Sequence, residues 1–280
     1  MRISALNIFP MKSARGIALE ESPIDAMGLA GDRRWMLTDE TGYFITQRDM
    51  PKLARLIALP TQSGLTLGLD EERLDIAIPS PDRRMEVVIW KSSVSAALAD
   101  DRVNARLSHW LEREVRLVFF DDRARRVASP EWAGSEAPVA FGDGYQVLVT
   151  TTGSLAALNA DMAAHGEETV GMDRFRANIV LEHDEAWAED GWSAIAIGDV
   201  VLDLVKPCAR CIMTTQDQQT GSREGASPMP AMGRIRMSGD RRVPGPLFGW
   251  NAVPRSSGHL KLGDRARVID TREAWSIKRR

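Results

Sequence analysis

Short runs in which apolar and polar residues alternate dominate the first 90 residues, and they constrain the fold more than any other feature. A period of two is typical of strands that bury one face. The runs span residues 2–9, 34–37, 43–46, 74–78 and 85–90. Turn signals at residues 39–42, 63–64 and 79–82 separate them, which suits antiparallel pairs better than strand–helix–strand units. The sequence therefore predicts a β-rich N-terminal region.

The rest of the chain predicts two helices and a second set of strands. Apolar residues recur at helical spacing between Asp100 and Arg113, and Ser154 is placed to cap a second helix. Strands are predicted at residues 115–120, 146–149, 178–181, 195–197, 200–205 and 265–269. Residues 121–144 and 222–242 have no clear period and predict long loops. The C-terminal half therefore predicts a second β-barrel or closed sheet.

These elements predict a mainly β fold with a few helices, of the α+β class. A length of 280 residues suits one large or two ordinary domains, and 44% hydrophobic residues suffice for a sizeable core. We predict a boundary near residue 120, with one domain over residues 1–120 and another over residues 121–275.

The charge balance excludes two broad classes of partner. The chain has 36 basic and 39 acidic residues, a formal charge of −3, so no overall positive field favours nucleic acid or an acidic membrane. The N-terminus is too polar for a signal peptide, and no run approaches the roughly 18 apolar residues of a membrane helix. Two cysteines cannot form a disulfide framework. We therefore predict a cytoplasmic protein without a membrane span.

Both cysteines, Cys208 and Cys211, lie three positions apart after an apolar strand-like run. Two thiols at this spacing can form a redox disulfide, supply half of a metal site, or leave one thiolate free. The four histidines are scattered, which disfavours zinc, and Pro207 does not fit the helix start of a thioredoxin-like motif. Arg210 favours a thiolate at Cys211 over two buried thiols. The residues alone leave these interpretations open.

The run from Pro207 to Thr215 closely resembles the signature of the MOSC family, which is named after the C-terminal domain of molybdenum cofactor sulfurase. Other segments are similar to the same family in the same order, namely residues 9–13, 27–29, 32–35, 46–48, 141–145, 154–155, 175–179, 197–199 and 246–249. The earlier segments resemble the N-terminal β-barrel domain that accompanies MOSC in the mitochondrial amidoxime-reducing component and its bacterial relatives. The resemblance covers nearly the whole chain and implies two β-barrel domains.

The resemblance also implies a cofactor, Mo-molybdopterin, and residues that hold it. Cys211 matches the thiolate ligand of the molybdenum and is the implied catalytic residue, since a metal with two dithiolene sulfurs is a soft centre that accepts another thiolate. The cofactor's phosphate requires cations and hydrogen-bond donors. The implied cofactor-binding residues are Lys12, Ser13, Arg33, Arg176, Asn178 and Ser154, the last through the N-terminal amides of the helix it would open.

The implied activity is the reduction of small N-hydroxylated compounds by oxygen-atom transfer at molybdenum. No cysteine follows Cys211, so we expect a separate electron donor, either a haem or an iron–sulfur protein with its own flavin reductase. Two other interpretations stay open. Cys211 could carry a persulfide in a sulfur- or cofactor-transfer protein, or the chain could be a β-barrel binding module with buried thiols.

Overall fold

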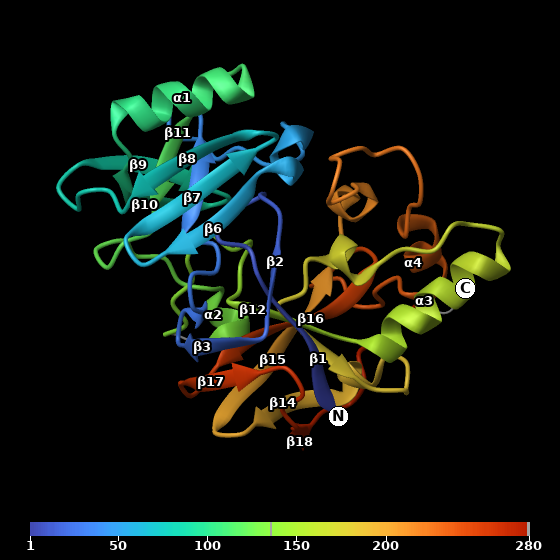
Figure 1. Ribbon diagram of the computed structural model, residues 1–280. Coiled ribbons are helices and arrows are strands. Elements are labelled where there is room, and N and C mark those ends of the chain that lie inside the picture. Colours follow the sequence, from blue (N-terminus) through green and yellow to red (C-terminus); the bar gives the residue numbers. More distant parts are fainter. Residues whose placement is uncertain (135, 279–280) are drawn as a thin grey trace.

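The computed structural model describes residues 1–134 and 136–278 and is mainly β, with 39% strand and 19% helix. This composition confirms the predicted fold class. Figure 1 shows two β-rich units side by side, which we call the N-terminal and the C-terminal unit and define below by their strands.

The N-terminal unit consists of two antiparallel sheets with a main core and a second hydrophobic cluster. The first sheet has, in spatial order, β5 (Trp35–Thr38), β11 (Arg116–Phe119), β10 (Ser92–Leu98) and β9 (Arg84–Ile89). The second has β6 (Ile57–Thr61), β7 (Gly64–Leu69) and β8 (Glu72–Ala77). The predicted amphipathic helix is confirmed as α1 (Asp101–Leu111), and its Leu107 and Trp110 join the core. This helix begins after Asp100 because that carboxylate accepts a hydrogen bond from the Val103 amide.

The C-terminal unit is one eight-stranded sheet that curls around a second core. Its order is β18 (Ala266–Thr271), β14 (Trp192–Ile197), β15 (Val200–Ala209), β16 (Leu247–Pro254), β12 (Val147–Thr151), β13 (Ile179–Glu182), β1 (Arg2–Ile8) and β2 (Ile17–Leu19). As far as this sheet is described, β12 and β13 pair in parallel and the other neighbouring strands pair antiparallel. The sheet meets itself where the Ile3 amide donates to the Asp264 carbonyl at 3.0 Å and the Ala266 amide donates to the Met1 carbonyl at 3.1 Å.

Strand pairing crosses the boundary that we predict near residue 120. β1 lies in the C-terminal sheet, where it pairs with β13. A small sheet of β17 (Gly258–Lys261), β3 (Glu21–Asp25) and β4 (Gly28–Leu29) makes a second link between the two ends of the chain. The chain leaves β1 and β4 directly before residues 9–13 and 32–33, so both segments lie where the two units meet.

The other α-helices belong to the C-terminal unit, and Figure 1 shows α3 and α4 together on one side of it. They are α2 (Pro130–Ala133), α3 (Thr152–Ala164) and α4 (Met229–Ile235), with 3-10 turns η2 (Met172–Phe175), η3 (Ala188–Gly191) and η4 (Ile212–Thr215). The 3-10 turn η1 (Pro51–Arg55) instead packs its Leu53 into the core of the N-terminal unit. The prediction of a plain loop over residues 222–242 is wrong, because α4 forms there and buries Ala231 and Met232 against Leu158 and Met162 of α3. Among the described residues, no helix is both long and apolar enough to cross a bilayer.

Two strand predictions also need correction. Residues 43–46 form isolated bridges instead of a strand, because Tyr43 meets Val88 and Phe44 meets Thr38 at single positions. β15 runs to Ala209, four residues beyond its predicted end, since register shifts accommodate Pro207 within the ladder. β16 was not predicted, and it pairs with the part of β15 that lies beyond the predicted end.

The position of β1 predicts the effect of a core mutation. Leu6 is 1% exposed inside the C-terminal unit, whereas Leu59 on β6 is 42% exposed. We expect Leu6→Ala to lower the free energy of unfolding by about 2–5 kcal/mol, because it leaves a cavity in that core. Leu59→Ala, the same chemical change at the surface, should alter it by less than about 0.5 kcal/mol. Urea denaturation of both variants checks this, and equal effects would contradict the placement of β1.

Candidate functional site

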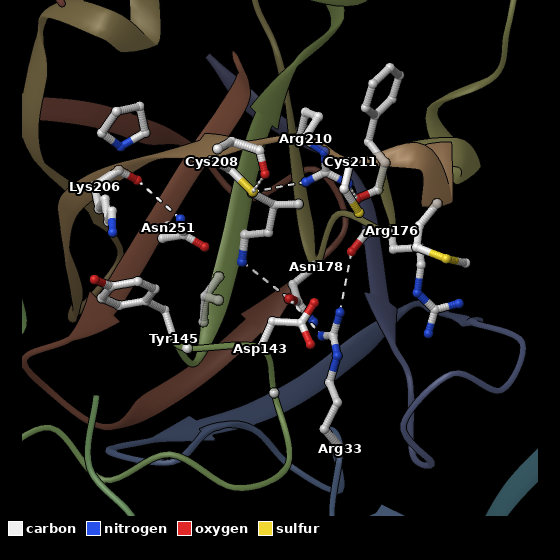
Figure 2. A pocket seen from close by; sticks show the side chains of 18 of the residues that line it. Arg33, Asp143, Tyr145, Arg176, Asn178, Lys206, Cys208, Arg210, Cys211 and Asn251 are labelled. Atoms are coloured by element: carbon white, nitrogen blue, oxygen red, sulfur yellow. Dashed lines mark hydrogen bonds between the residues drawn. The ribbon is translucent and has the colours of Figure 1, made fainter. Parts of the chain in front are cut away.

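A cavity of about 520 Å³ lies where the two units meet, and Figure 2 shows side chains from both ends of the chain around it. Eight cationic residues line it: Lys12, Arg33, Arg48, Arg174, Arg176, Lys206, Arg210 and Arg242. Asp143 is the one carboxylate among the described lining residues. A chain with a formal charge of −3 therefore concentrates positive charge at this place, which is typical of a site for a multiply charged anion.

Arg33 and Arg176 share one buried aromatic ring. The guanidinium carbon of each lies 4.2 Å from the ring centroid of Phe9, which is 5% exposed. A ring face attracts a cation and so offsets part of the repulsion between the two charges. Burial, followed by repulsion from Arg33, lowers the pKa of Arg176 to about 9. In the described structure Arg176 forms no ion pair and donates to the Ala14 carbonyl and to Gln218.

Asp32 and Asn178 orient Arg33. Arg33 donates to Asp32 Oδ2 and, at 2.9 Å, to Asn178 Oδ1. Burial raises the pKa of Asp32, although its bond to Arg33 acts against that rise. The Asn178 amide also accepts from the Leu148 N–H and donates to the Asn7 carbonyl, so it ties β1 to β12. Asn178 therefore lines the cavity with most of its hydrogen-bonding capacity already used by the protein.

Lys12 is buried and reaches the cavity from the end of the turn after β1. Its ammonium donates to Asp143 Oδ1 and to the Phe141 carbonyl, the latter at 3.1 Å. Burial lowers the pKa of Lys12, although Asp143 acts in the opposite direction. Lys12 and Arg33 hold the pKa of Asp143 well below its usual range, because both cations favour its charged form. The Asp143 side chain is 75% exposed, so it faces the water of the cavity while protein cations surround it.

Several cavity residues have a strained backbone. Seven described residues other than glycine have a left-handed φ, and they include Ser13 at 67°, Arg33 at 48° and Arg176 at 54°. Such conformations are unfavourable for residues with a side chain, and they cluster at functional sites. In the case of Ser13, the Gln47 amide donates to its carbonyl at 2.7 Å and fixes the turn.

The sulfur of each cysteine accepts a hydrogen bond from an arginine. Arg48 donates to Cys211 Sγ at 3.1 Å, and Arg210 donates to Cys208 Sγ at 2.9 Å. Both thiols are free; Cys211 is exposed and Cys208 is half-buried. Cys211 stands directly before η4, and its carbonyl accepts from the Thr214 amide and hydroxyl. Among the described residues, no three His, Cys, Asp or Glu side chains gather as a metal site, so a metal here would need ligands from outside the chain.

Ser154 does not line the cavity. It is fully buried, and its hydroxyl donates to Glu189 Oε2 at 2.8 Å. The prediction that Ser154 caps the helix is wrong: α3 begins at Thr152, and the Thr151 hydroxyl accepts from the Ser154 amide. Thr151 also donates to Glu189, so an internal carboxylate occupies the helix start at which we expected an external anion.

The other predicted site residues lie together. The cavity is lined by Lys12, Ser13, Arg33, Arg176, Asn178 and Cys211, although more than 190 positions separate the first from the last. Sequence reasoning did not assign Arg48, Asp143 or Lys206 to the site. Arg48 lies in the 46–48 segment that carries the family resemblance, which is the signal that could have identified it. Asp143 lies in the 141–145 segment, which also carries the resemblance, so the same signal could have identified it.

Comparison with known proteins agrees with this architecture. The MOSC N-terminal beta barrel domain matches residues 1–114 and the MOSC domain matches residues 136–267. Human mitochondrial amidoxime-reducing component 1 is 30% identical over 94% of this chain and 81% of its own length. The chain belongs to the MOSC family. This confirms the resemblance, while the boundary at residue 120 stays a prediction.

Other relatives of this MOSC protein carry similar names. Mitochondrial amidoxime reducing component 2 of the rat is 29% identical over 96% of this chain and 83% of its own length. The mitochondrial amidoxime-reducing component 1 of the zebrafish (Danio rerio) is 27% identical over 94% of this chain and 83% of its own length. Among solved structures, the YUAD protein from Bacillus subtilis covers 95% of this chain and 93% of its own, at 10% identity and a TM-score of 0.40, which is too low to carry an argument.

The electrostatics of the cavity predict how anion binding depends on pH. Sulfate should raise the melting temperature near pH 7.5, because a dianion neutralises the cations around Phe9. The rise should shrink as the pH passes about 9, since Arg176 loses its proton there and the pKa of Lys12 is also lowered. Arg176→Gln should reduce the effect near pH 7.5 and weaken its dependence on pH, because the variant lacks the charge that the wild type loses near pH 9. Arg123→Gln, at an exposed ion pair, should leave both unchanged. Thermal denaturation between pH 7.5 and 10 measures this; a constant sulfate effect would contradict it.

Proposed function

We propose that this MOSC protein binds Mo-molybdopterin in the cavity and reduces small N-hydroxylated compounds. The observation that carries the proposal is the exposed thiol of Cys211 on the edge of a cavity whose described lining has eight cations and one carboxylate. A molybdenum–pterin cofactor requires a soft ligand for its metal, which a thiolate provides. It also requires cationic hydrogen-bond donors for its phosphate, which the arginines and lysines provide. The names of the relatives, which describe amidoxime-reducing components, support the same activity.

The side chains fit the cofactor. Arg176 is half-buried without a carboxylate partner in the described structure, and the Nε atom of half-buried Arg210 has no hydrogen-bond partner. Partly buried cations of this kind are stabilised when an anion binds between them. We assign the phosphate to Lys12, Ser13, Arg33 and Arg176, and we assign to Asn178 the role of holding Arg33 in place. Cys211 would ligate the molybdenum as a thiolate.

When bound, the cofactor would supply a two-electron metal centre that accepts the oxygen atom of an N-hydroxyl group. The chain's own residues would position this chemistry. Arg48 donates to the Cys211 sulfur and so fixes its direction. The Lys12 ammonium donates a hydrogen bond to the Asp143 carboxylate, so this pair would present a donor and an acceptor beside the bound cofactor.

The reaction consumes two electrons and two protons and releases the reduced nitrogen compound and water. We infer that the electrons come from a separate protein, either a haem or an iron–sulfur protein with its own flavin reductase. The two cysteines of this sequence, with one assigned to molybdenum, do not form the ligand set of an iron–sulfur cluster.

A transfer role is the second candidate, and the exposure of Cys211 favours it. An exposed sulfur that accepts a hydrogen bond from Arg48 could carry a persulfide and pass it, or the cofactor, to another protein. The two functions differ in what the purified protein holds. A carrier would have cyanide-labile sulfur on Cys211 and no catalytic turnover, whereas the enzyme would hold molybdenum and pterin.

Replacement of each cysteine tests the proposed function. We expect Cys211→Ala to lose most of its molybdenum and to reduce benzamidoxime about a hundredfold more slowly or worse, since loss of even an outer partner of a metal costs about 10–100-fold. Cys208→Ala, the same change three residues earlier, should keep both. Metal analysis and reduction assays with a chemical electron donor measure these effects. Molybdenum content and activity that do not depend on Cys211 would refute the assignment.

A further inference from the structure

Trp90 has a large exposed side chain where the backbone disfavours one. Trp90 and Lys91 form the two-residue turn between β9 and β10, and Trp90 has a left-handed φ of 54°. Hairpin turns with positive φ favour glycine, asparagine or aspartate, so a tryptophan there is an outlier. The residue is nevertheless 41% exposed, so burial in the core does not account for it. Strain of this kind directs attention to function.

Trp90 is not among the residues that line the cavity, but it contacts three that are. Its indole N–H donates to Asp143 Oδ1 at 3.4 Å. The guanidinium of Arg48 lies 5.2 Å from its ring centroid, and the ammonium of Lys12 lies 5.9 Å from it. Arg48 also donates to Cys211 Sγ, so one arginine connects the indole with the proposed metal ligand. The ring of Trp90 therefore lies at the rim of the cavity, on the side of Cys211.

The indole ring of Trp90 packs against a buried aromatic residue of the protein. Phe44 is buried, and its ring centroid lies 4.9 Å from that of Trp90. Together with the bond to Asp143, this contact holds the indole while part of it faces solvent. A surface that is already ordered loses little entropy when a ligand packs against it.

We propose that Trp90 is a specificity-determining residue that stacks against the planar apolar part of the substrate while the N-hydroxyl group enters the cavity. The proposal rests on the function proposed above and names its preferred substrate class, which is N-hydroxylated compounds carried on an aromatic ring. An amidoxime is neutral, so the cations of the cavity give it little attraction. The indole offers the apolar contact that the cationic lining does not.

Two substrates and two variants test this in the cofactor-loaded protein. Benzamidoxime and acetamidoxime share the reacting group, and only the first has a ring. We expect Trp90→Ala to raise KM for benzamidoxime about fivefold, the range of one aromatic pair, and to leave KM for acetamidoxime within about twofold. Trp90→Phe should retain most of the preference, because it keeps an aromatic face.

Tyr43→Ala is the matched control. Tyr43 is 53% exposed and packs on the same Phe44, at 5.1 Å between ring centroids, and it has no aromatic or cation contact with the cavity residues among those described. Its replacement should change neither KM. Isothermal titration of benzamidoxime into each oxidised, cofactor-loaded protein gives a second readout without turnover.

Equal changes for the two substrates, or no change in Trp90→Ala, would overturn the role of Trp90 and leave the proposed function intact. Failure of the wild type to reduce either compound would instead refute the proposed function. In that case the titrations decide about Trp90: weaker benzamidoxime binding in Trp90→Ala alone would support it. Equal binding by wild type and variant, or no binding by either, would reject it.

Discussion

The placement of two like charges on one buried ring is the interaction on which the candidate site depends. Arg33 and Arg176 come from the two halves of the chain, and Phe9 holds both guanidiniums at 4.2 Å. The protein neutralises one of them with Asp32 and leaves the other without a carboxylate in the described structure. The unbalanced charge is the feature that would attract an anion to the cavity, and Arg33 and Arg176 both present their side chains from a left-handed backbone.

Much of the fold could be predicted from the sequence where the pattern is local. Strands such as β1 and β9 show a period of two, and α1 shows an apolar stripe and an aspartate cap. Within the site, the family resemblance selected Lys12, Arg33, Arg176 and Cys211, which meet at one cavity. Composition and spacing alone identified only the cysteine segment.

The remaining features depend on contacts between distant residues, which local patterns do not contain. The partner of β1 is β13, far along the chain, so the crossing between the units could not be predicted. Ser154 is a residue type that commonly caps helices. Its hydroxyl instead donates to Glu189, which is remote in sequence, and does not reach the cavity. Asp143 and Arg48 belong to irregular segments, and only the packing of the units brings them beside Lys12 and Cys211.

The position of β1 also bears on how the protein is made. A chain leaves the ribosome from its N-terminus, so β1 must wait for β13, and the sheet meets itself only after residues 264–266 have been synthesised. Phe9 and Arg33 emerge early, yet Arg176 and Cys211 join them only after many more residues have been synthesised. Because such non-local pairing forms slowly, the cavity is completed late in folding. Capture of the proposed cofactor would therefore be coupled to closure of the C-terminal sheet.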